Sequence, residues 1–491
     1  MKKLSLAFLA GAAAVLSFAP TSIYPLGIAS LAVLAALWLP ARPLQALALG
    51  FSFGLGLFGA GVSWVYVSLS VYGGMPAMLA AFATLCFCAL LALFPAGAGW
   101  LQARIPAGEG VRAALLIPAA WTIFEWLRTW MLTGFPWLAF GYGATGWPTQ
   151  GFAPITGVFG VSFLSAALAG LVVLVLRREN RIPAVIAIVV LVVGGQLLRM
   201  AEWTRAEPRT LEVSLLQGNI PQELKFRPER YERILETYTR LAEESPAKLI
   251  VMPETAVPRL LDAIDPAFLA RLDRAARRND GDVILGVAFR AKAGEYYNSV
   301  VTLGVSPSQA YHKTHLVPFG EFVPAAFGWV MQWLEIPMSD FSAGSTDQPP
   351  LAIAGERVAP NICYEDAFGA EIARQARQAT LLANVSNVAW FGDSLAPSQH
   401  LQIARMRAIE TGRMHLTSTN TGITAAIDRD GTVLARLPQF AEGRLEIMAR
   451  GYSGSTPYMR VGDWPILVAS LGLLAAFVLR ARSRRREMPS G

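Results

Sequence analysis

Residues 249–255, which read LIVMPET, decide the fold of the polar part of this chain. The run from Leu249 to Met252 is apolar without alternation, as in a strand that is buried on both faces. Pro253 interrupts the run, and Glu254 follows directly. Because strand ends that lead into loops are where functional side chains usually lie, this stretch predicts a covered sheet with a carboxylate at its edge.

The surroundings of this strand, from about residue 205 to 455, predict one soluble domain of about 250 residues, which is long enough for a substantial core. Short β-rich runs alternate with charged helical patterns, which is typical of a layered α/β or α+β domain. The expected strands are residues 211–216, 248–252, 282–289, 298–303, 309–312, 357–362 and 380–384. The expected helices are residues 228–244, 266–279, 367–378 and 398–412.

Two further strand ends carry reactive side chains. The stretch AYHKTHLVPFGEFVP at 310–324 places Lys313 after one strand, and VAPNICYEDAF at 358–368 places Cys363 between a strand and a predicted helix. A helix N-terminus and a nearby ammonium both favour the thiolate, so we expect the pKa of Cys363 to lie below its usual 8.5 or so. Cys363, Glu254 and Lys313 would then supply a nucleophile, a base and a cation for a tetrahedral oxyanion.

Other kinds of site fit this domain less well. His312 and His315 flank Lys313 and allow a Cys–His pair, but the lysine accounts for that strand end equally well. The chain has four histidines, and Cys363 is the only cysteine of the domain, with no tight ligand spacing. We therefore expect neither a metal nor a cofactor.

The rest of the chain is far more apolar. The residues AVILMFWYC make up 54% of the sequence and charged residues 16%, against about 25% charged in soluble proteins. This composition excludes a disordered chain, a collagen-like repeat and a small disulfide scaffold. Eight apolar runs approach the length of about 20 residues that spans a bilayer. They lie near residues 4–20, 25–40, 45–70, 76–100, 112–132, 153–176, 183–198 and 464–479.

The basic residues in the short connections predict how the chain crosses the membrane. Lys and Arg residues occur before the first run, between alternate runs and after the last run, whereas the connections near 21–24, 70–75 and 134–150 have none. Both termini are then cytoplasmic and the polar domain lies outside. The net charge of +7 is largely a topology signal, which removes most of the case for nucleic acid. The first run also has the length of a signal peptide, but the spans that follow favour a retained helix.

The order and flanks of the three residues resemble the nitrilase, or carbon–nitrogen hydrolase, superfamily. Glu254 in MPET, Lys313 in YHKTHLVPFGE and Cys363 in ICYED match its Glu–Lys–Cys triad. The resemblance covers about residues 211–438 and implies an αββα sandwich. It also suggests that Glu321 is a second essential carboxylate, which positions Lys313 or an incoming amine. Tyr364 and Glu365 would support the nucleophile, with the backbone N–H of Tyr364 as an oxyanion donor.

Nearly the whole chain resembles the bacterial apolipoprotein N-acyltransferase family, which has seven spans, this domain and one last span. The stretches that carry the resemblance are EWLRTWMLTGFPWLAFGY at 125–142, QGNIPQELKF at 217–226, FGEFVP at 319–324, NVSNVAWFGDS at 384–394 and QIARMRAIETGR at 402–413. Two positions depart from the expected pattern: Val388 stands in place of an acidic residue and Phe226 in place of a tryptophan.

The resemblance implies a membrane domain at residues 1–204, a periplasmic catalytic domain at 205–455, and a final helix with a basic tail at 456–491 of an inner-membrane enzyme. A phospholipid would give an acyl chain to the cysteine, and the α-amino group of a diacylglyceryl-cysteine would take it from the thioester. Four aromatic residues are candidates for substrate-binding or lid residues. They are Trp390, Phe391, and Trp329 and Trp333 in the apolar arm at 325–341, which would otherwise be a packed amphipathic helix.

Two rival functions remain open from the sequence. A membrane-anchored amidase or nitrilase would use the same triad and release the acyl group to water. A transporter or scaffold would use the outer domain only for binding, but transporters tend to show internal repeats, and no clear repeat is visible. Nothing in the sequence demands an oligomer, so we expect a monomer.

Overall fold

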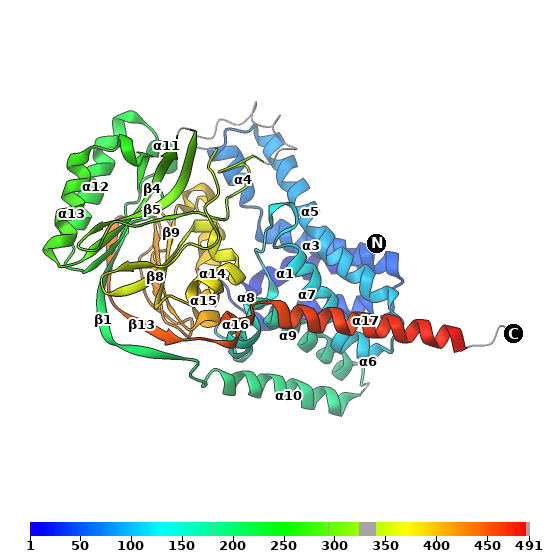
Figure 1. The fold of residues 1–491 in the computed structure, drawn as a ribbon. Coiled ribbons are helices and arrows are strands. Elements are labelled where there is room, and N and C mark those ends of the chain that lie inside the picture. Colours follow the sequence, from blue (N-terminus) through cyan, green and yellow to red (C-terminus); the bar gives the residue numbers. More distant parts are fainter. Residues whose placement is uncertain (179, 293, 324–339, 488–491) are drawn as a thin grey trace. The chain divides into compact units, whose positions relative to one another are not determined.

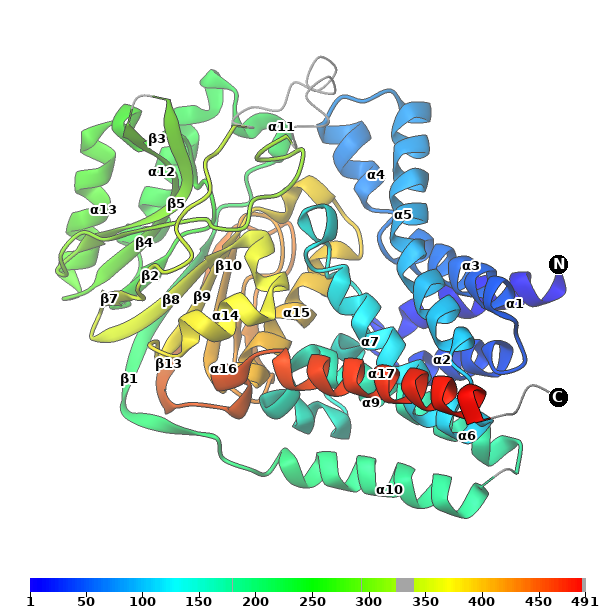
Figure 2. The same ribbon diagram turned by 45° about the vertical axis from the view of Figure 1, so that its right-hand side comes forward.

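The computed structural model describes residues 1–178, 180–292, 294–323 and 340–487 (Figures 1 and 2). By their internal contacts, the residues form two compact units. The first unit comprises Met1–Ser63, Ala81–Ala201 and Val461–Gly491, and the second comprises Trp64–Ala80 and Glu202–Arg460. The second unit therefore contains the expected catalytic domain together with a segment from the N-terminal apolar part of the sequence.

The first unit is helical. Its main helices are α1 (Lys2–Ala14), α2 (Tyr24–Trp38), α3 (Pro43–Gly61), α5 (Ala77–Arg104), α7 (Ile117–Leu127), α9 (Ala153–Leu176), α10 (Arg181–Leu198) and α17 (Trp464–Glu487). Within the described residues, six helical segments are long and apolar enough to cross a membrane: Pro43–Gly61, Ala77–Arg104, Glu109–Leu127, Pro148–Leu176, Arg181–Leu198 and Trp464–Ala481. The first two expected spans fall instead on the shorter helices α1 and α2.

The surface of these helices fits a lipid environment. Apolar side chains of α10 point away from the core, with Ile182 74% exposed and Leu197 62% exposed. Exposed apolar faces of this kind are unfavourable in water but not in hydrocarbon. Close helix contacts use glycine, because a Cβ on Gly56 of α3 would lie 2.1 Å from the carbonyl oxygen of Phe8 in α1. This protein is therefore a membrane protein.

The third apolar run is shorter as a helix than the sequence predicts. We expected a span over residues 45–70, but α3 ends at Gly61. The chain continues as the single turn α4 (Val65–Val67) and the π-helical turn η2 (Ser68–Tyr72), both of which belong to the second unit. The reason is aromatic packing: the ring of Trp64 lies 4.6 Å from that of Phe391, measured between centroids. Residues 64–72 thus cover part of the second unit.

The second unit is built on two sheets. Among the described residues, the first sheet runs in the order β13-β1-β2-β4-β5-β6, with β3 also paired to β4. The second sheet runs in the order β12-β11-β10-β9-β8-β7. The strands of the first sheet are β1 (Thr204–Gln217), β2 (Leu249–Val251), β3 (Val257–Leu260), β4 (Asp282–Lys292), β5 (Glu295–Gly304), β6 (Ala310–His312) and β13 (Gly443–Gly454). Those of the second are β7 (Leu351–Ile353), β8 (Glu356–Ile362), β9 (Leu381–Ser386), β10 (Met414–Thr419), β11 (Ala425–Ile427) and β12 (Val433–Arg436).

The two sheets pack face to face, and helices cover their outer faces (Figure 1). Buried residues such as Val251 of β2 and Val385 of β9 share the core between the sheets. A second core joins the first sheet to α12 (Tyr231–Glu243) and α13 (Pro266–Arg278). Smaller cores join the second sheet to α14 (Gly369–Ala376) and α15 (Ala396–Thr411). The expected αββα sandwich is confirmed.

The central strands of each sheet run parallel, which gathers the chemical groups at one edge. Strands β1, β2 and β4 are parallel neighbours, as are β8, β9 and β10. The carboxyl ends of parallel strands lie at one edge of a sheet, so the residues that follow them come together. Glu254, Cys363 and Asn387 are such residues.

Candidate active site

Cys363 stands at the end of β8 in a strained backbone conformation. Its φ of 55° lies in the left-handed region, which a residue with a Cβ seldom adopts unless its surroundings hold it there. The residue begins the 3₁₀ turn η9 (Cys363–Ala367), whereas α14 begins only at Gly369. The expected α-helix N-terminus at the thiol is therefore wrong, because six residues, Cys363 to Phe368, separate Ile362 from the helix. The sharp turn instead presents the half-buried side chain at the end of the strand.

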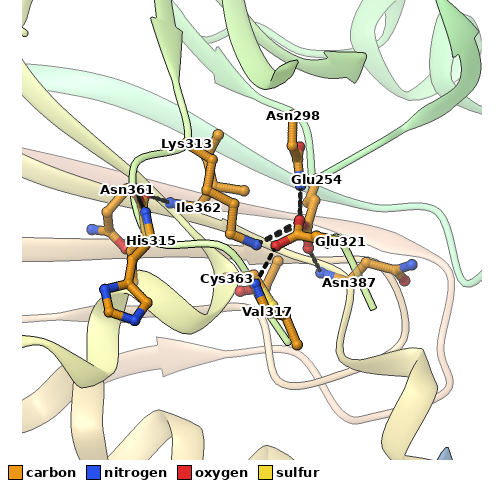
Figure 3. A network of polar contacts seen from close by, with 12 residues as sticks. Glu254, Asn298, Lys313, His315, Val317, Glu321, Asn361, Ile362, Cys363 and Asn387 are labelled. Atoms are coloured by element: carbon orange, nitrogen blue, oxygen red, sulfur yellow. Dashed lines mark hydrogen bonds and ion pairs between the residues drawn. The ribbon is translucent and has the colours of Figure 1, made fainter. Parts of the chain in front are cut away.

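Lys313 lies between two carboxylates (Figure 3). Its Nζ is 2.8 Å from Oε1 of Glu321 and 3.3 Å from Oε1 of Glu254. The lysine is 1% exposed, and the two glutamates are 7% and 8% exposed. A buried ammonium is costly unless it is paired, and this arrangement pairs it twice. The structure thus brings together Glu254, Lys313 and Glu321 beside Cys363.

Asparagine side chains and backbone amides fix both carboxylates. The Nδ2 of Asn298 on β5 donates to Oε1 of Glu254 at 2.7 Å and to Oε1 of Glu321 at 2.6 Å. The backbone N–H of Asn387 donates to Oε2 of Glu254 at 2.8 Å, and that of Val317 donates to Oε2 of Glu321 at 2.8 Å. Each carboxylate is therefore held in one orientation. Asn298 was not predicted as a site residue, because a single asparagine within a strand gives no distinctive signal.

The electrostatics of the resting site favour a thiol next to an ionised glutamate. Burial raises the pKa of Cys363, Glu254 raises it further, and Lys313 only partly opposes them. Burial would also raise the pKa of Glu254, but Lys313, Asn298 and the amide of Asn387 outweigh it, so that this pKa is lowered. Burial disfavours the charge of Lys313, yet Glu254 and Glu321 together raise its pKa. The expected lowering of the cysteine pKa is wrong, since burial and the neighbouring carboxylate dominate.

Glu365 connects the end of β6, which Lys313 follows, to the end of β8, which Cys363 follows. Its Oε2 accepts from the backbone N–H of Ile362 at 2.7 Å, and its Oε1 accepts from the backbone N–H of Thr314 at 2.6 Å. The hydroxyl of Tyr311 donates to both oxygens, at 3.0 and 3.1 Å. This carboxylate is 1% exposed. Its hydrogen bonds therefore link the backbone that follows Lys313 to the backbone that precedes Cys363.

Three aromatic residues, Trp64, Trp390 and Phe391, form a cluster that we call the aromatic wall, and two of them lie in the turn that follows Asn387. Trp390 and Phe391, which the sequence selects, lie in the 3₁₀ turn η10 (Val388–Phe391). The carbonyl oxygen of Trp390 accepts from the hydroxyl of Ser68 at 2.8 Å, and Phe391 packs on Trp64. The arm at 325–341 with Trp329 and Trp333 lies almost wholly outside the described residues. The contribution of residues 64–72 was missed, because their apolar composition predicted a membrane span.

The histidines beside Lys313 do not pair with the cysteine. Nδ1 of His312 lies 2.7 Å from the hydroxyl of Ser299, and its ring packs against Tyr297. The ring of His315 stacks on Phe368 with centroids 3.4 Å apart, and Figure 3 shows it apart from the ammonium of Lys313. Among the described residues, no group of three or more His, Cys, Asp or Glu is arranged to hold a metal ion.

A second buried lysine was missed. Lys225, in the stretch QELKF, is 1% exposed, and its Nζ lies 3.4 Å from the carbonyl oxygen of Glu254. Burial lowers its pKa to about 8, although Glu254 and Cys363 oppose the shift. A lysine in a polar stretch is usually solvated, so no pattern in the sequence distinguishes it. Phe226, where the expected pattern has tryptophan, is the next residue.

Comparison with known proteins defines the class and then the family. Residues 212–450 match the family model for carbon–nitrogen hydrolases, and together with the sandwich this places the polar domain in that class of proteins. Residues 10–171 match the model for the N-terminal domain of apolipoprotein N-acyltransferase. A solved amidase of the nitrilase superfamily from Nesterenkonia AN1 is 18% identical over 53% of this chain and 97% of its own, with a TM-score of 0.38.

Relatives match over nearly the full length. The apolipoprotein N-acyltransferase of Nitrosomonas europaea is 46% identical over 99% of both chains. Those of Ralstonia nicotianae and Methylococcus capsulatus are 46% and 44% identical, over 97% and 100% of this chain and 94% and 98% of their own. The chain belongs to the apolipoprotein N-acyltransferase family, which confirms the resemblance seen in the sequence.

Proposed function

We propose that this protein is a phospholipid:apolipoprotein N-acyltransferase that works through a thioester on Cys363. It would move a fatty acyl chain from a phospholipid to the α-amino group of the N-terminal diacylglyceryl-cysteine of a lipoprotein. One observation carries the proposal: a chain similar over its whole length to apolipoprotein N-acyltransferases buries a carboxylate and an ammonium 3.3 Å apart beside a cysteine. These are the base, the oxyanion cation and the nucleophile that acyl transfer requires.

In the first step, Glu254 takes the proton of the Cys363 thiol as the sulfur attacks the ester carbonyl carbon of the phospholipid. The lowered pKa of Glu254 and the raised pKa of the thiol make a free thiolate unfavourable, so proton transfer accompanies attack. Lys313 and the N–H of Tyr364 stabilise the oxyanion. The ester C–O bond then breaks, and the protonated Glu254 returns its proton to the departing lysophospholipid oxygen.

In the second step, the α-amino nitrogen of the acceptor attacks the thioester carbonyl. The new C–N bond forms, the C–S bond breaks, and Glu254 carries the proton lost by the amine to the departing sulfur. Glu321 positions Lys313 in both steps, because its oxygen is the closer of the two carboxylate partners. One pocket can serve both substrates, since the lysophospholipid leaves before the amine enters.

The proposed location is a bacterial inner membrane, with both termini in the cytoplasm and the catalytic domain in the periplasm. The basic residues of the short connections support it, because they recur in alternate connections. Both substrates are anchored in that membrane. The aromatic wall of Trp64, Trp390 and Phe391 offers an apolar surface for the acyl chain near Asn387, whose amide holds the catalytic base.

The test is an intact-mass measurement on purified protein in detergent. After incubation with a phospholipid of defined chains, the protein should gain the mass of one acyl group, and Cys363→Ala should gain none. Addition of a diacylglyceryl peptide with a free N-terminal cysteine should discharge the adduct and acylate the peptide. The same peptide with an acetylated α-amine is the matched control and should leave the adduct intact. Absence of any adduct, or its release as free fatty acid at the same rate without acceptor, would contradict the proposal.

A further inference from the structure

Two buried side chains contact the carbonyl oxygen of the peptide bond between Cys363 and Tyr364. The carbonyl oxygen of Cys363 accepts from Nδ2 of Asn384 at 3.1 Å and lies 3.2 Å from Nε2 of His400. Asn384 stands on β9 and is 0% exposed, whereas His400 stands on α15 and is 3% exposed. These two contacts are separate from the ion pairs that join Lys313 to Glu254 and Glu321. Two side chains from different elements therefore meet at one backbone oxygen of the nucleophile.

The surroundings of both side chains determine which atoms donate. A carbonyl oxygen can only accept, so the proton of a neutral His400 stands on Nε2. Oδ1 of Asn384 accepts from the hydroxyl of Ser386 at 2.5 Å, which leaves the amide nitrogen toward Cys363. Asp366, which is 0% exposed, lies 3.6 Å from Nε2 of His400 and 2.9 Å from Nε2 of His415. The buried aspartate is hydrogen-bonded to His415, whereas its contact with His400 is electrostatic, and it is His400 that reaches the carbonyl oxygen of Cys363.

These two contacts act on the peptide unit that contains the proposed oxyanion donor, the N–H of Tyr364. The carbonyl of Cys363 and the N–H of Tyr364 belong to one planar peptide unit, so that fixing the oxygen also fixes the direction of the N–H. Hydrogen bonds to the oxygen polarise the unit and strengthen its N–H as a donor, by roughly 10–30% per bond. The left-handed φ of Cys363 needs such support to persist.

We propose that His400 and Asn384 are positioning residues that orient and polarise the Cys363–Tyr364 peptide toward the oxyanion of the acyl-transfer reaction. The proposal rests on Cys363 being the acylated residue. The buried Asp366 lies 3.6 Å from Nε2 of His400, and its charge favours an N–H at that nitrogen. The proposal also predicts that replacing His400 weakens reactions of Cys363 that form an oxyanion and leaves other reactions of the thiol unchanged.

The experiment compares two reagents for Cys363 on the full-length protein in detergent. A short fatty aldehyde adds to the thiol: the S–C bond forms, the C=O π bond opens, and the thiol proton passes to the aldehyde oxygen, which occupies the place of the oxyanion. Iodoacetamide alkylates the same sulfur with loss of iodide and forms no oxyanion. His400→Phe removes the donor. His415→Phe is the matched control, because His415 also contacts Asp366 but lies on β10 and bonds Thr417 instead of the nucleophile.

We expect His400→Phe to weaken aldehyde binding about tenfold, less than the 10²–10³-fold typical for loss of a whole oxyanion donor, with an unchanged alkylation rate. His400→Gln, which keeps an N–H donor, should restore most of the affinity. Equal losses in the His400 and His415 variants, or a parallel fall in alkylation, would show a merely structural role and overturn the proposal. If His400→Phe does not fold, Asn384→Leu tests the second donor with the same pair of reagents. The intact-mass measurement of the acyl adduct on the wild-type protein tests the proposed function separately.

Discussion

Replacing Glu365 with glutamine tests whether this residue holds the catalytic groups in register. The carboxylate accepts hydrogen bonds on both oxygens from the strand ends that carry Lys313 and Cys363. A glutamine has only one acceptor oxygen. In its best orientation this oxygen keeps the bonds from Thr314 and His315, and the new NH₂ group meets the N–H of Ile362, which then has no acceptor.

The size of the effect follows from these contacts. The loss of a hydrogen bond to a charged group and an unsatisfied buried N–H together cost about 2–5 kcal/mol. Burial raises the pKa of Glu365, which means that its charge is itself penalised in the folded state. Glutamine removes that penalty, so we expect the lower half of the range, roughly 2–3 kcal/mol. For a unit of this size that is about 5–10 °C in Tm. A displacement of Lys313 by about 1 Å should also slow acylation by roughly 10²-fold.

The assay combines thermal unfolding in detergent with the single-turnover rate of acyl-enzyme formation. Glu371→Gln is the matched control on the same segment, because its side chain is 34% exposed and its contact with Nδ1 of His315 is 3.3 Å long. A partly exposed pair of this kind contributes at most about 1 kcal/mol, so its Tm should move by no more than about 2–4 °C and its rate should not change. A Glu365→Gln variant that matches this control in both measurements would refute the bracing role.

Three further outcomes are expected. Cys363→Ser should form less than about 1% of the wild-type acyl adduct by intact mass, because a hydroxyl is far harder to deprotonate than a thiol; near-native labelling would exclude Cys363 as nucleophile. Glu321→Ala removes the 2.8 Å partner of Lys313, and breaking a buried pair costs about 3–5 kcal/mol, so no acyl-enzyme should form; an adduct that forms normally but cannot be passed to the amine would move Glu321 to the second step. Burial lowers the pKa of Lys225 from 10.5 to about 8 in the folded protein. Between these pH values the unfolded chain binds the proton more readily than the folded chain does. The stability of the wild-type protein therefore rises with pH across this range. Lys225→Met should lack this rise and should be more stable at pH 7 by about 3 kcal/mol at most, measured as Tm from pH 7 to 10; parallel Tm curves would contradict the argument.

Periodicity was sufficient to locate the elements that frame the site. The strands that precede Glu254, Lys313 and Cys363 lie where their apolar runs predict them, because a buried strand needs such a run whatever surrounds it. Strands β10 to β13 were not predicted. β13 pairs with β1 along its length, yet exposed polar side chains interrupt its apolar pattern, so only its long-range partner makes it a strand.

The sequence by itself determined a membrane protein with one layered α/β or α+β domain, because these features depend on residue type and on periodicities within a single segment. Its resemblance to a known family implied the αββα layers and the candidate side chains for acyl transfer. Only the tertiary structure decided the raised pKa of Cys363, the pairing of Lys313 with Glu321, and the departure of residues 64–72 from the membrane-spanning set. The physical reason is that burial, charge pairing and aromatic packing each depend on groups that are far apart in the chain and that only the complete fold brings together.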